Sequence, residues 1–341
     1  MQQNATGASG QLLPRYRQPL TFGAVLDETF QIYRKEWLRL IGILALLIVP
    51  TTVLMGALGA FTVFSLASNP GVLTSRDPAD VLQFMGSAAA AGAVLGLLFG
   101  LATVIAGAAA VACTDRVMRG QEPAVWSSYG RALGRIGGVF LGMLALIVAY
   151  VVLVVLSSVA VLLWVLPGLF GLTPLVALVV WAANPGARQG WLKWLIILTT
   201  PFGLAIYFGI KWALWLQPIV LEGRGPVEAI QRSQALMAGN WFRSAGVLLV
   251  IGLITGILQA LPGGILSILV GGAVGLQGGA DQGYLAMNVV SNAANFIAYP
   301  LFGGLAFITT TLLFVDLRNR HEGTDLEERL SELESSSFAA Q

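Results

Sequence analysis

Long apolar runs alternate with short polar segments along most of this chain. A helix that spans a bilayer needs about 20 mostly apolar residues. Six runs reach that length, at residues 40–67, 84–113, 139–166, 192–221, 244–270 and 285–315. The fourth run contains Pro201, Lys211 and Pro218 but is still long enough to cross. The pattern predicts an all-α, polytopic helical membrane protein with about six transmembrane helices.

A shorter apolar run, at residues 169–183, lies between the third and fourth predicted spans. Short cytoplasmic loops are enriched in Lys and Arg, and this enrichment sets the orientation of a membrane protein. With six spans, the four basic clusters between and beside the spans all lie on one side. A seventh crossing would move the later clusters to the other side. We therefore expect residues 169–183 to be re-entrant or surface-lying, and both termini to be cytosolic.

Three segments of the chain share a pattern that leads into a pair of spans. Each segment has Arg-x-x-Gly where a span begins, and each pair of spans ends in an acid followed closely by arginine. The first feature is carried by Arg39, Arg135 and Arg243, and the second by Asp115, Glu222 and Asp316. The pattern predicts three hairpins within one membrane domain at 19–317, as internal repeats of about 20–118, 119–224 and 225–318.

The residues ahead of each hairpin have the periodicity of an amphipathic helix. In the first copy, apolar residues recur at spacings of three and four, at Phe22, Leu26, Phe30, Tyr33, Trp37 and Leu40. The second copy shows this stripe more weakly, and the third continues it with a break at Ser233 and Gln234. Aromatic residues beside arginine are typical of a helix in the headgroup region of a membrane. We expect each hairpin to be preceded by an amphipathic interfacial helix.

The two ends of the chain differ from the apolar region between them. Residues 1–18 are polar and have no apolar core, which excludes a cleavable signal peptide and predicts a disordered cytosolic lead-in. Residues 318–341 are acidic, and a capping box with a short leucine stripe predicts a helix there. This tail is a candidate site for a protein partner.

Composition narrows the possible chemistry. Only 11% of the residues are charged, against about 25% in soluble domains. The net charge of +2 is too small to indicate a nucleic-acid partner. The chain has one cysteine, Cys113, and one histidine, His321, so it lacks the residues for a cysteine metal cluster or a nucleophile–base pair. We expect no metal, no cofactor and no enzymatic activity.

Three stretches of the chain resemble a prokaryotic family, the glycerophosphoryl diester phosphodiesterase membrane domain. They are PLTFG at 19–23 with LDETF at 26–30, VLEGRGP at 220–226, and DLRNR at 316–320. The resemblance implies a multi-pass protein of the prokaryotic cytoplasmic (inner) membrane. The residues after the last predicted span leave no room for a phosphodiesterase barrel. The resemblance therefore implies the fold and not the reaction.

Polar residues inside two predicted spans are candidates for function. An ionisable residue in a span, such as Lys211, is a functional candidate by default. Alternatively, Lys211 reaches the interface, where Trp212 and Trp215 form an aromatic belt. One face of the last span carries Asn288, Asn292, Asn295 and Tyr299. This face either lines a polar cavity or forms hydrogen bonds between helices.

The repeated acids and two glycine runs have similar alternatives. Asp115, Glu222 and Asp316 are expected at the cytosolic ends of three spans, where they either pair with Arg39, Arg135 and Arg243 or form a gate or lipid-headgroup site. Small residues four apart allow helices to approach closely. Such runs occur at Gly92, Gly96 and Gly100, and at Gly134, Gly138 and Gly142. They serve either packing within the monomer or homo-oligomerisation.

These patterns favour a non-enzymatic membrane protein that organises lipids or protein partners at the membrane. The abundance of predicted interfacial helices is the main reason. The alternative is a transporter or channel with a polar cavity near Lys211 and the face formed by Asn288, Asn292 and Asn295.

Overall fold

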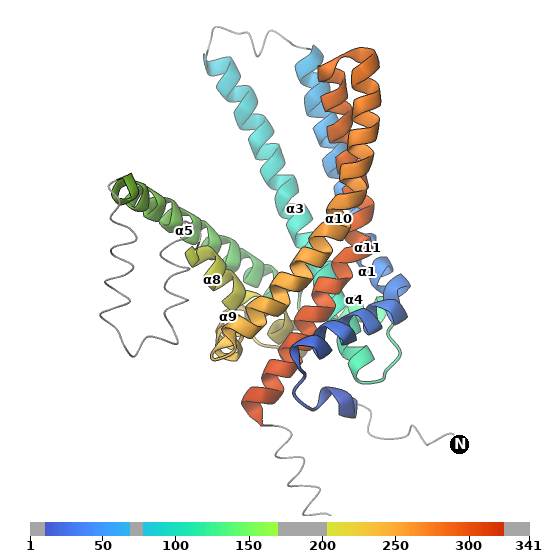
Figure 1. The fold of residues 1–341 in the computed structure, drawn as a ribbon, viewed down its shortest axis with the longest axis vertical. Coiled ribbons are helices and arrows are strands. Elements are labelled where there is room, and N and C mark those ends of the chain that lie inside the picture. The colour runs from blue at the N-terminus through green and yellow to red at the C-terminus, as the bar shows by residue number, and fades with distance from the viewer. Residues whose placement is uncertain (1–10, 69–77, 170–202, 324–341) are drawn as a thin grey trace, which may run out of the picture.

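The computed structural model of the protein describes residues 11–68, 78–169 and 203–323 (Figure 1). Every regular element in these ranges is a helix. The long helices are α1 (Phe22–Ser68), α3 (Pro78–Met118), α5 (Ile136–Leu169), α10 (Trp241–Gly278) and α11 (Ala280–Glu322). The shorter ones are η1 (Pro14–Tyr16), α4 (Val125–Leu133), α8 (Gly203–Trp212), η3 (Pro218–Glu222) and α9 (Pro226–Met237).

Five helices in the described ranges are long and apolar enough to cross a membrane. Their candidate spans are Phe22–Gly59, Leu82–Met118, Ile136–Val155, Trp241–Gly278 and Phe296–Glu322. The predicted class, a helical polytopic membrane protein, is thereby confirmed. The predicted span at 192–221 begins outside the described residues. Its described part, residues 203–221, contains α8 and most of η3. Residues 170–183 of the segment expected to be re-entrant or surface-lying are also outside them.

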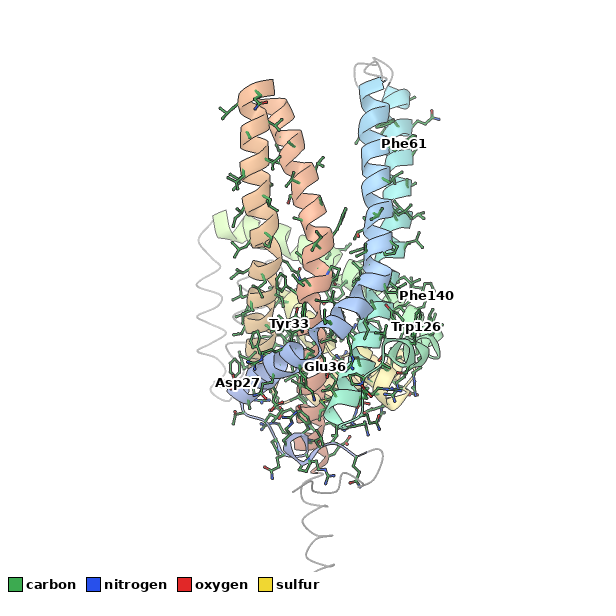
Figure 2. All side chains as sticks on the ribbon, turned by 90° about the vertical axis from the view of Figure 1, so that its right-hand side faces the viewer. Asp27, Tyr33, Glu36, Phe61, Trp126 and Phe140 are labelled. Carbon is green, nitrogen blue, oxygen red and sulfur yellow. The ribbon has the colours of Figure 1, made fainter. Side chains whose placement is uncertain are left out.

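A short helical segment precedes a long helix at each of the three places where the sequence predicts one. In α1, Glu36 has non-helical backbone angles (φ −118°, ψ 18°), so the helix kinks there. Figure 2 shows Asp27 on the part that runs across the base of the bundle, and Phe61 far along the part that rises from it. Helices α4 and α9 lie directly before α5 and α10 in the chain. We call the end of the bundle where these three short segments lie the charged end.

The first part of α1 turns a different face to the protein from the predicted apolar stripe. Its buried residues are Val25, Thr29, Ile32 and Glu36. Three members of the predicted stripe, Phe22, Phe30 and Trp37, are 40%, 41% and 45% exposed. Phe22, Phe30 and Trp37 therefore point outward, whereas Tyr33 of the same stripe packs on α11 and donates to the Leu301 carbonyl. The face that packs on the bundle mixes polar and apolar residues.

The best-packed part of the molecule is at the charged end, where α11 is the central helix. Helix α11 contacts α1, α3, α9 and α10. Its residues Ile308, Leu312 and Phe314 are fully buried, together with an alanine-rich stretch of α3 at residues 108–112. Beyond this core, Figure 1 shows α3 leaning away from α1 and α5 running off to the side, whereas α10 and α11 stay together.

The polar residues at the start of the chain are more ordered than the sequence predicts. A disordered lead-in was expected at residues 1–18, but residues 11–18 have a defined structure, and the prediction is wrong for them. Tyr16 in η1 is only 1% exposed. Its contacts come from distant helices, which composition does not reveal. Residues 1–10 lie outside the described ranges. At the other end, α11 continues to Glu322, and residues 324–341 of the predicted acidic tail also lie outside.

Candidate functional site at the charged end

Asp316, near the end of α11, is the centre of the most buried charged cluster. Its side chain is 0% exposed and pairs with Arg243 of α10 at 2.5 Å and with Arg320 at 3.1 Å. Its Oδ1 atom also accepts the backbone N–H of Leu20 at 2.7 Å. A buried carboxylate is tolerated only where such partners offset the loss of hydration. The cluster therefore fixes α10, α11 and the start of the chain together.

Asp115, near the end of α3, has a similar set of partners. The side chain is 5% exposed, and both of its oxygens accept from Arg119 Nε at 3.0 Å. Arg131 of α4 donates to it at 3.1 Å. Asp115 with Arg119 and Asp316 with Arg320 are both i, i+4 pairs in which Nε is the donor. The cluster attaches α4 to the end of α3.

Glu222 forms a third cluster, at the end of η3. Arg224 Nε donates to it at 2.5 Å, and Arg232 of α9 lies 3.4 Å from its other oxygen. Arg232 also forms an ion pair with Glu322 of α11. This cluster connects η3, α9 and the last turn of α11.

The three acids were predicted to pair with the three repeat arginines, and one such ion pair is present. Arg243 pairs with Asp316, as expected. Arg39 instead pairs with the buried Glu36 at the kink of α1, at 2.6 Å, and with Glu122 at 3.3 Å. Arg135 donates to the backbone carbonyl of Ile219 at 3.0 Å. The kink of α1 and the position of η3 decide these two partners, and neither is visible in the repeat pattern.

Lys211 lies in the last turn of α8 among aromatic rings. Its ammonium is 4.8 Å from the centre of the Tyr207 ring, a cation–π contact. Tyr207 stacks on Trp241, the first residue of α10, at 5.7 Å, and Ser233 of α9 donates to the Lys211 carbonyl at 2.7 Å. Lys211 is therefore at the level of α9 and of the start of α10. The ring contacts continue through Tyr150, Phe208, Trp212 and Phe242.

The asparagine face of α11 (Asn288, Asn292 and Asn295) is far from Lys211. The side chains of these three residues lie outside what the structure describes, but their helix positions are defined. Gly263 of α10 meets Ser291 and Ala294 beside this face. Gly263 is 22 residues beyond Trp241 in α10, or about 33 Å at 1.5 Å per residue. In the described part of the chain, Lys211 and the asparagine face therefore do not line one cavity.

Three grooves on the described helices are lined almost wholly by apolar side chains. The first lies along α5 beside Trp215, the second along α10 and α11 near Gly271 and Tyr284, and the third between α1 and α3. Their lining fits acyl chains better than polar solutes. Among the described residues, no group of three or more His, Cys, Asp or Glu side chains is placed to hold a metal ion.

The two glycine runs have different surroundings. A Cβ atom placed on Gly142 would lie 2.6 Å from the Trp215 ring, so this run allows α5 to pack on the segment before η3. Gly138 likewise faces Ile219. By contrast, Gly92 and Gly96 have no other side chain or backbone of the described residues within 4 Å of a placed Cβ.

Several residues of the site were not singled out from the sequence. The spacing of four residues between Asp115 and Arg119, and between Asp316 and Arg320, is a signal that could have identified both pairs. Glu36 pairs with Arg39 three residues further along the same helix, which is also a spacing signal. Arg131 and Arg232 have no such signal, because their partners come from other helices. Comparison with protein-family models, curated proteins and solved structures gives no match for this chain. The assignment of function therefore rests on the geometry of the charged end.

Proposed function

We propose that this chain is a non-enzymatic protein of the prokaryotic cytoplasmic membrane that organises lipids through interfacial helices at its charged end. The basic segments and the family resemblance support the cellular membrane and cytosolic termini. The similar acid–arginine pairs of α3 and α11 support an origin by internal repetition. The observation that carries the proposal is the exposure of aromatic residues beside basic ones on the short segments.

Exposed aromatic side chains cover two of the short segments. Trp126 on α4 is 77% exposed, and Phe30 and Trp37 on α1 are 41% and 45% exposed. Figure 2 shows Trp126 and Phe140 on the same side of the molecule, near the foot of α5. Tryptophan side chains such as Trp37 and Trp126 partition to the headgroup region, where the apolar ring and the indole N–H are both accommodated. They would hold α1 and α4 in the plane of the membrane surface.

Positive charge accompanies these aromatic residues. Arg34 and Lys35 are exposed on the first part of α1, before the kink at Glu36. Each basic side chain near an anionic membrane surface contributes about 1 kcal/mol of attraction. Lys211 and its aromatic neighbours add an interfacial contact on α8. Anionic phospholipids are therefore the lipids that this surface fits best.

The ion-pair clusters would keep these surfaces in fixed positions. Asp115 attaches α4 to α3, and the Glu222 cluster attaches α9 to η3 and α11. A fixed array of interfacial helices orders neighbouring lipids more than a mobile array does, because less conformational entropy is lost when a lipid binds. A protein partner for residues 324–341 is a further proposal that the charge of this tail supports.

The test compares lipid binding by two full-length variants. The first combines Arg34→Gln, Lys35→Gln and Trp126→Ala. The second, Leu276→Ala, changes an apolar residue of α10 that is 92% exposed, more than Trp126. Two lost charges at about 1 kcal/mol each predict roughly 30-fold weaker binding of anionic phospholipid to the first variant. Native mass spectrometry of protein titrated with phosphatidylglycerol measures this binding.

Leu276→Ala is expected to bind phosphatidylglycerol as the wild type does. Circular dichroism and gel filtration of both variants check that the fold is retained. If the triple variant folds and binds phosphatidylglycerol with wild-type affinity, the interfacial surface does not organise lipid and the proposal fails.

A further inference from the structure

The first described residues of the chain form a segment that crosses the charged end. We call residues 11–20 the N-terminal strap. The N–H of Leu13 donates to the Met118 carbonyl at the end of α3, at 2.9 Å. Asn319 of α11 donates to the Tyr16 carbonyl at 2.8 Å. The strap thus connects the ends of the first and third hairpins.

The Asp316 cluster binds both backbone groups of Leu20, its N–H and its carbonyl. Asp316 accepts the N–H of Leu20, while Arg243 and Arg320 each donate to the Leu20 carbonyl at 2.7 Å. Three charged side chains therefore recognise the backbone of a single residue. These contacts use no property of the Leu20 side chain, so other extended segments can make them too.

A second contact of the strap is specific for an aromatic side chain. The Tyr16 ring is 1% exposed, and its hydroxyl donates to Glu28 of α1 at 2.8 Å. Burial, followed by this hydrogen bond to Glu28, raises the pKa of Tyr16 above its ordinary value. The hydroxyl is therefore a donor at physiological pH. Tyr16 and Leu20, four residues apart, are the two main points of attachment.

The rest of the strap is less deeply buried than the helices beneath it. Tyr16 is its only fully buried residue, and Leu12, Leu13 and Leu20 pack half-buried against the core. Its one regular element is the three-residue η1. Segments with few buried apolar contacts open at a lower free energy than the core around them. By contrast, the helices on which the strap lies contain fully buried residues such as Val25, Met118 and Leu317. The strap can therefore detach while these helices stay folded.

From these contacts we propose that the strap can be displaced from the charged end, and that the surface it covers is a docking site for an extended peptide segment. Residues 11–20 of the same chain occupy this docking site in the structure. Detachment would uncover the Tyr16 pocket and the backbone-binding groups of Asp316, Arg243 and Arg320. It would also remove a connection between the first and third hairpins. The proposal is independent of lipid binding by the exposed aromatic surface.

Hydrogen–deuterium exchange of the full-length protein in nanodiscs tests whether the strap can be displaced. Amides of the strap are expected to exchange faster than those of the buried part of α11. In Asp316→Asn, exchange at Leu20 is expected to rise about 10- to 100-fold, because a hydrogen bond to a charged group contributes about 1.5–3 kcal/mol. Arg318→Gln is the matched control, since Arg318 faces the Phe314 ring. Equal exchange of the strap and the core in the wild type would overturn the proposal.

The docking site is tested with a fluorescent peptide of residues 11–20. Tyr16→Ala in the full-length protein removes the aromatic attachment and should release the strap from the docking site. Fluorescence anisotropy is expected to show saturable peptide binding to Tyr16→Ala and at least about tenfold weaker binding to the wild type, whose own strap competes. A peptide with alanine at the Tyr16 position should not bind. If exchange shows that the strap of Tyr16→Ala is released, yet no peptide binds, there is no docking site.

Discussion

The first hairpin, α1 with α3, and the third, α10 with α11, start from the same charged end but differ beyond it. Helices α10 and α11 are joined by Gly279 alone, which has a φ of +93°, and they stay side by side (Figure 1). Helix α3 instead leans away from α1. A groove of about 530 Å³ lies between α1 and α3, lined by Leu54, Ala57, Leu58, Ala90, Ala91, Val94 and Leu95.

Glycine placement explains the difference. A Cβ atom on Gly283 of α11 would lie 2.8 Å from the carbonyl oxygen of Gly271 and from the Cα of Gly275, so the two backbones are in contact. Gly92 and Gly96 of α3 have the same four-residue spacing but face no neighbour within 4 Å in the described part of the chain. A run of small residues therefore gives close packing only where another element faces it, as Gly271 and Gly275 of α10 face Gly283.

The largest effect is expected at Asp316, which joins α10 and α11 of the third hairpin to the strap. Asp316→Ala leaves Arg243 and Arg320 without their carboxylate, and breaking a buried ion pair costs about 3–5 kcal/mol. Glu122→Ala is the exposed comparison. It removes a surface partner of Arg39 and is expected to cost at most about 1 kcal/mol. Chemical unfolding in detergent micelles measures both changes. Similar losses for the two variants would contradict the central place of Asp316.

An intermediate effect is expected for glycines that distinguish the two hairpins. Gly283→Ala forces the α10 and α11 backbones apart, and overpacking of this kind costs about 1–3 kcal/mol. Gly96→Ala adds a methyl group where there is space and improves helix propensity, so it should be neutral or stabilising by up to about 1 kcal/mol. Thermal unfolding in nanodiscs gives both values. A destabilising Gly96→Ala would mean that another surface covers this face of α3.

The smallest effect is expected from a tyrosine of α4, the short helix that packs on the first hairpin. Burial raises the pKa of Tyr129 of α4 to about 12, and its hydroxyl donates to the Ile43 carbonyl of α1 at 2.5 Å. The unfolded chain loses this proton near pH 10. The stabilising contribution is therefore complete below about pH 10 and is lost as the pH rises through 12.

Tyr129→Phe removes the titrating group and keeps the ring. Its melting temperature is expected to fall less steeply between pH 10 and pH 12 than that of the wild type. Thermal unfolding at several pH values measures the two slopes. Parallel slopes would show that Tyr129 does not couple folding to alkaline pH.

Apolar length and periodicity were sufficient to predict the class of fold and the short helices before the hairpins. Transmembrane helices follow directly from these patterns, because a bilayer requires an apolar run of set length. The kink at Glu36 was not predictable in the same way, since no proline or glycine marks it. The rotation of the first part of α1 was also missed, because Thr29 and Glu36 are buried against other helices.

The ion pairs show which charged partners the sequence pattern can predict and which it cannot. The acids Asp115, Glu222 and Asp316 were identified from the repeat, but two of the three predicted arginine partners are different. Partners within one helix follow from spacing, as for Asp115 and Arg119. Partners from separate helices depend on packing, as for Asp115 and Arg131. The contact of Lys211 with Tyr207 is within one helix and follows from spacing. The ordered strap around Tyr16 depends on contacts with separate helices, so spacing does not predict it.

The position of α4 in the bilayer tests most directly whether the charged end is an interfacial surface. A spin label at Trp126→Cys, in a background with Cys113→Ala, reports its depth by power-saturation EPR in vesicles that contain phosphatidylglycerol. A label at Leu97→Cys of α3 gives the reference inside the hydrocarbon. We predict that the label at position 126 lies at headgroup depth and the label at position 97 lies deeper. A label at position 126 in bulk water, or as deep as that at position 97, would contradict the account.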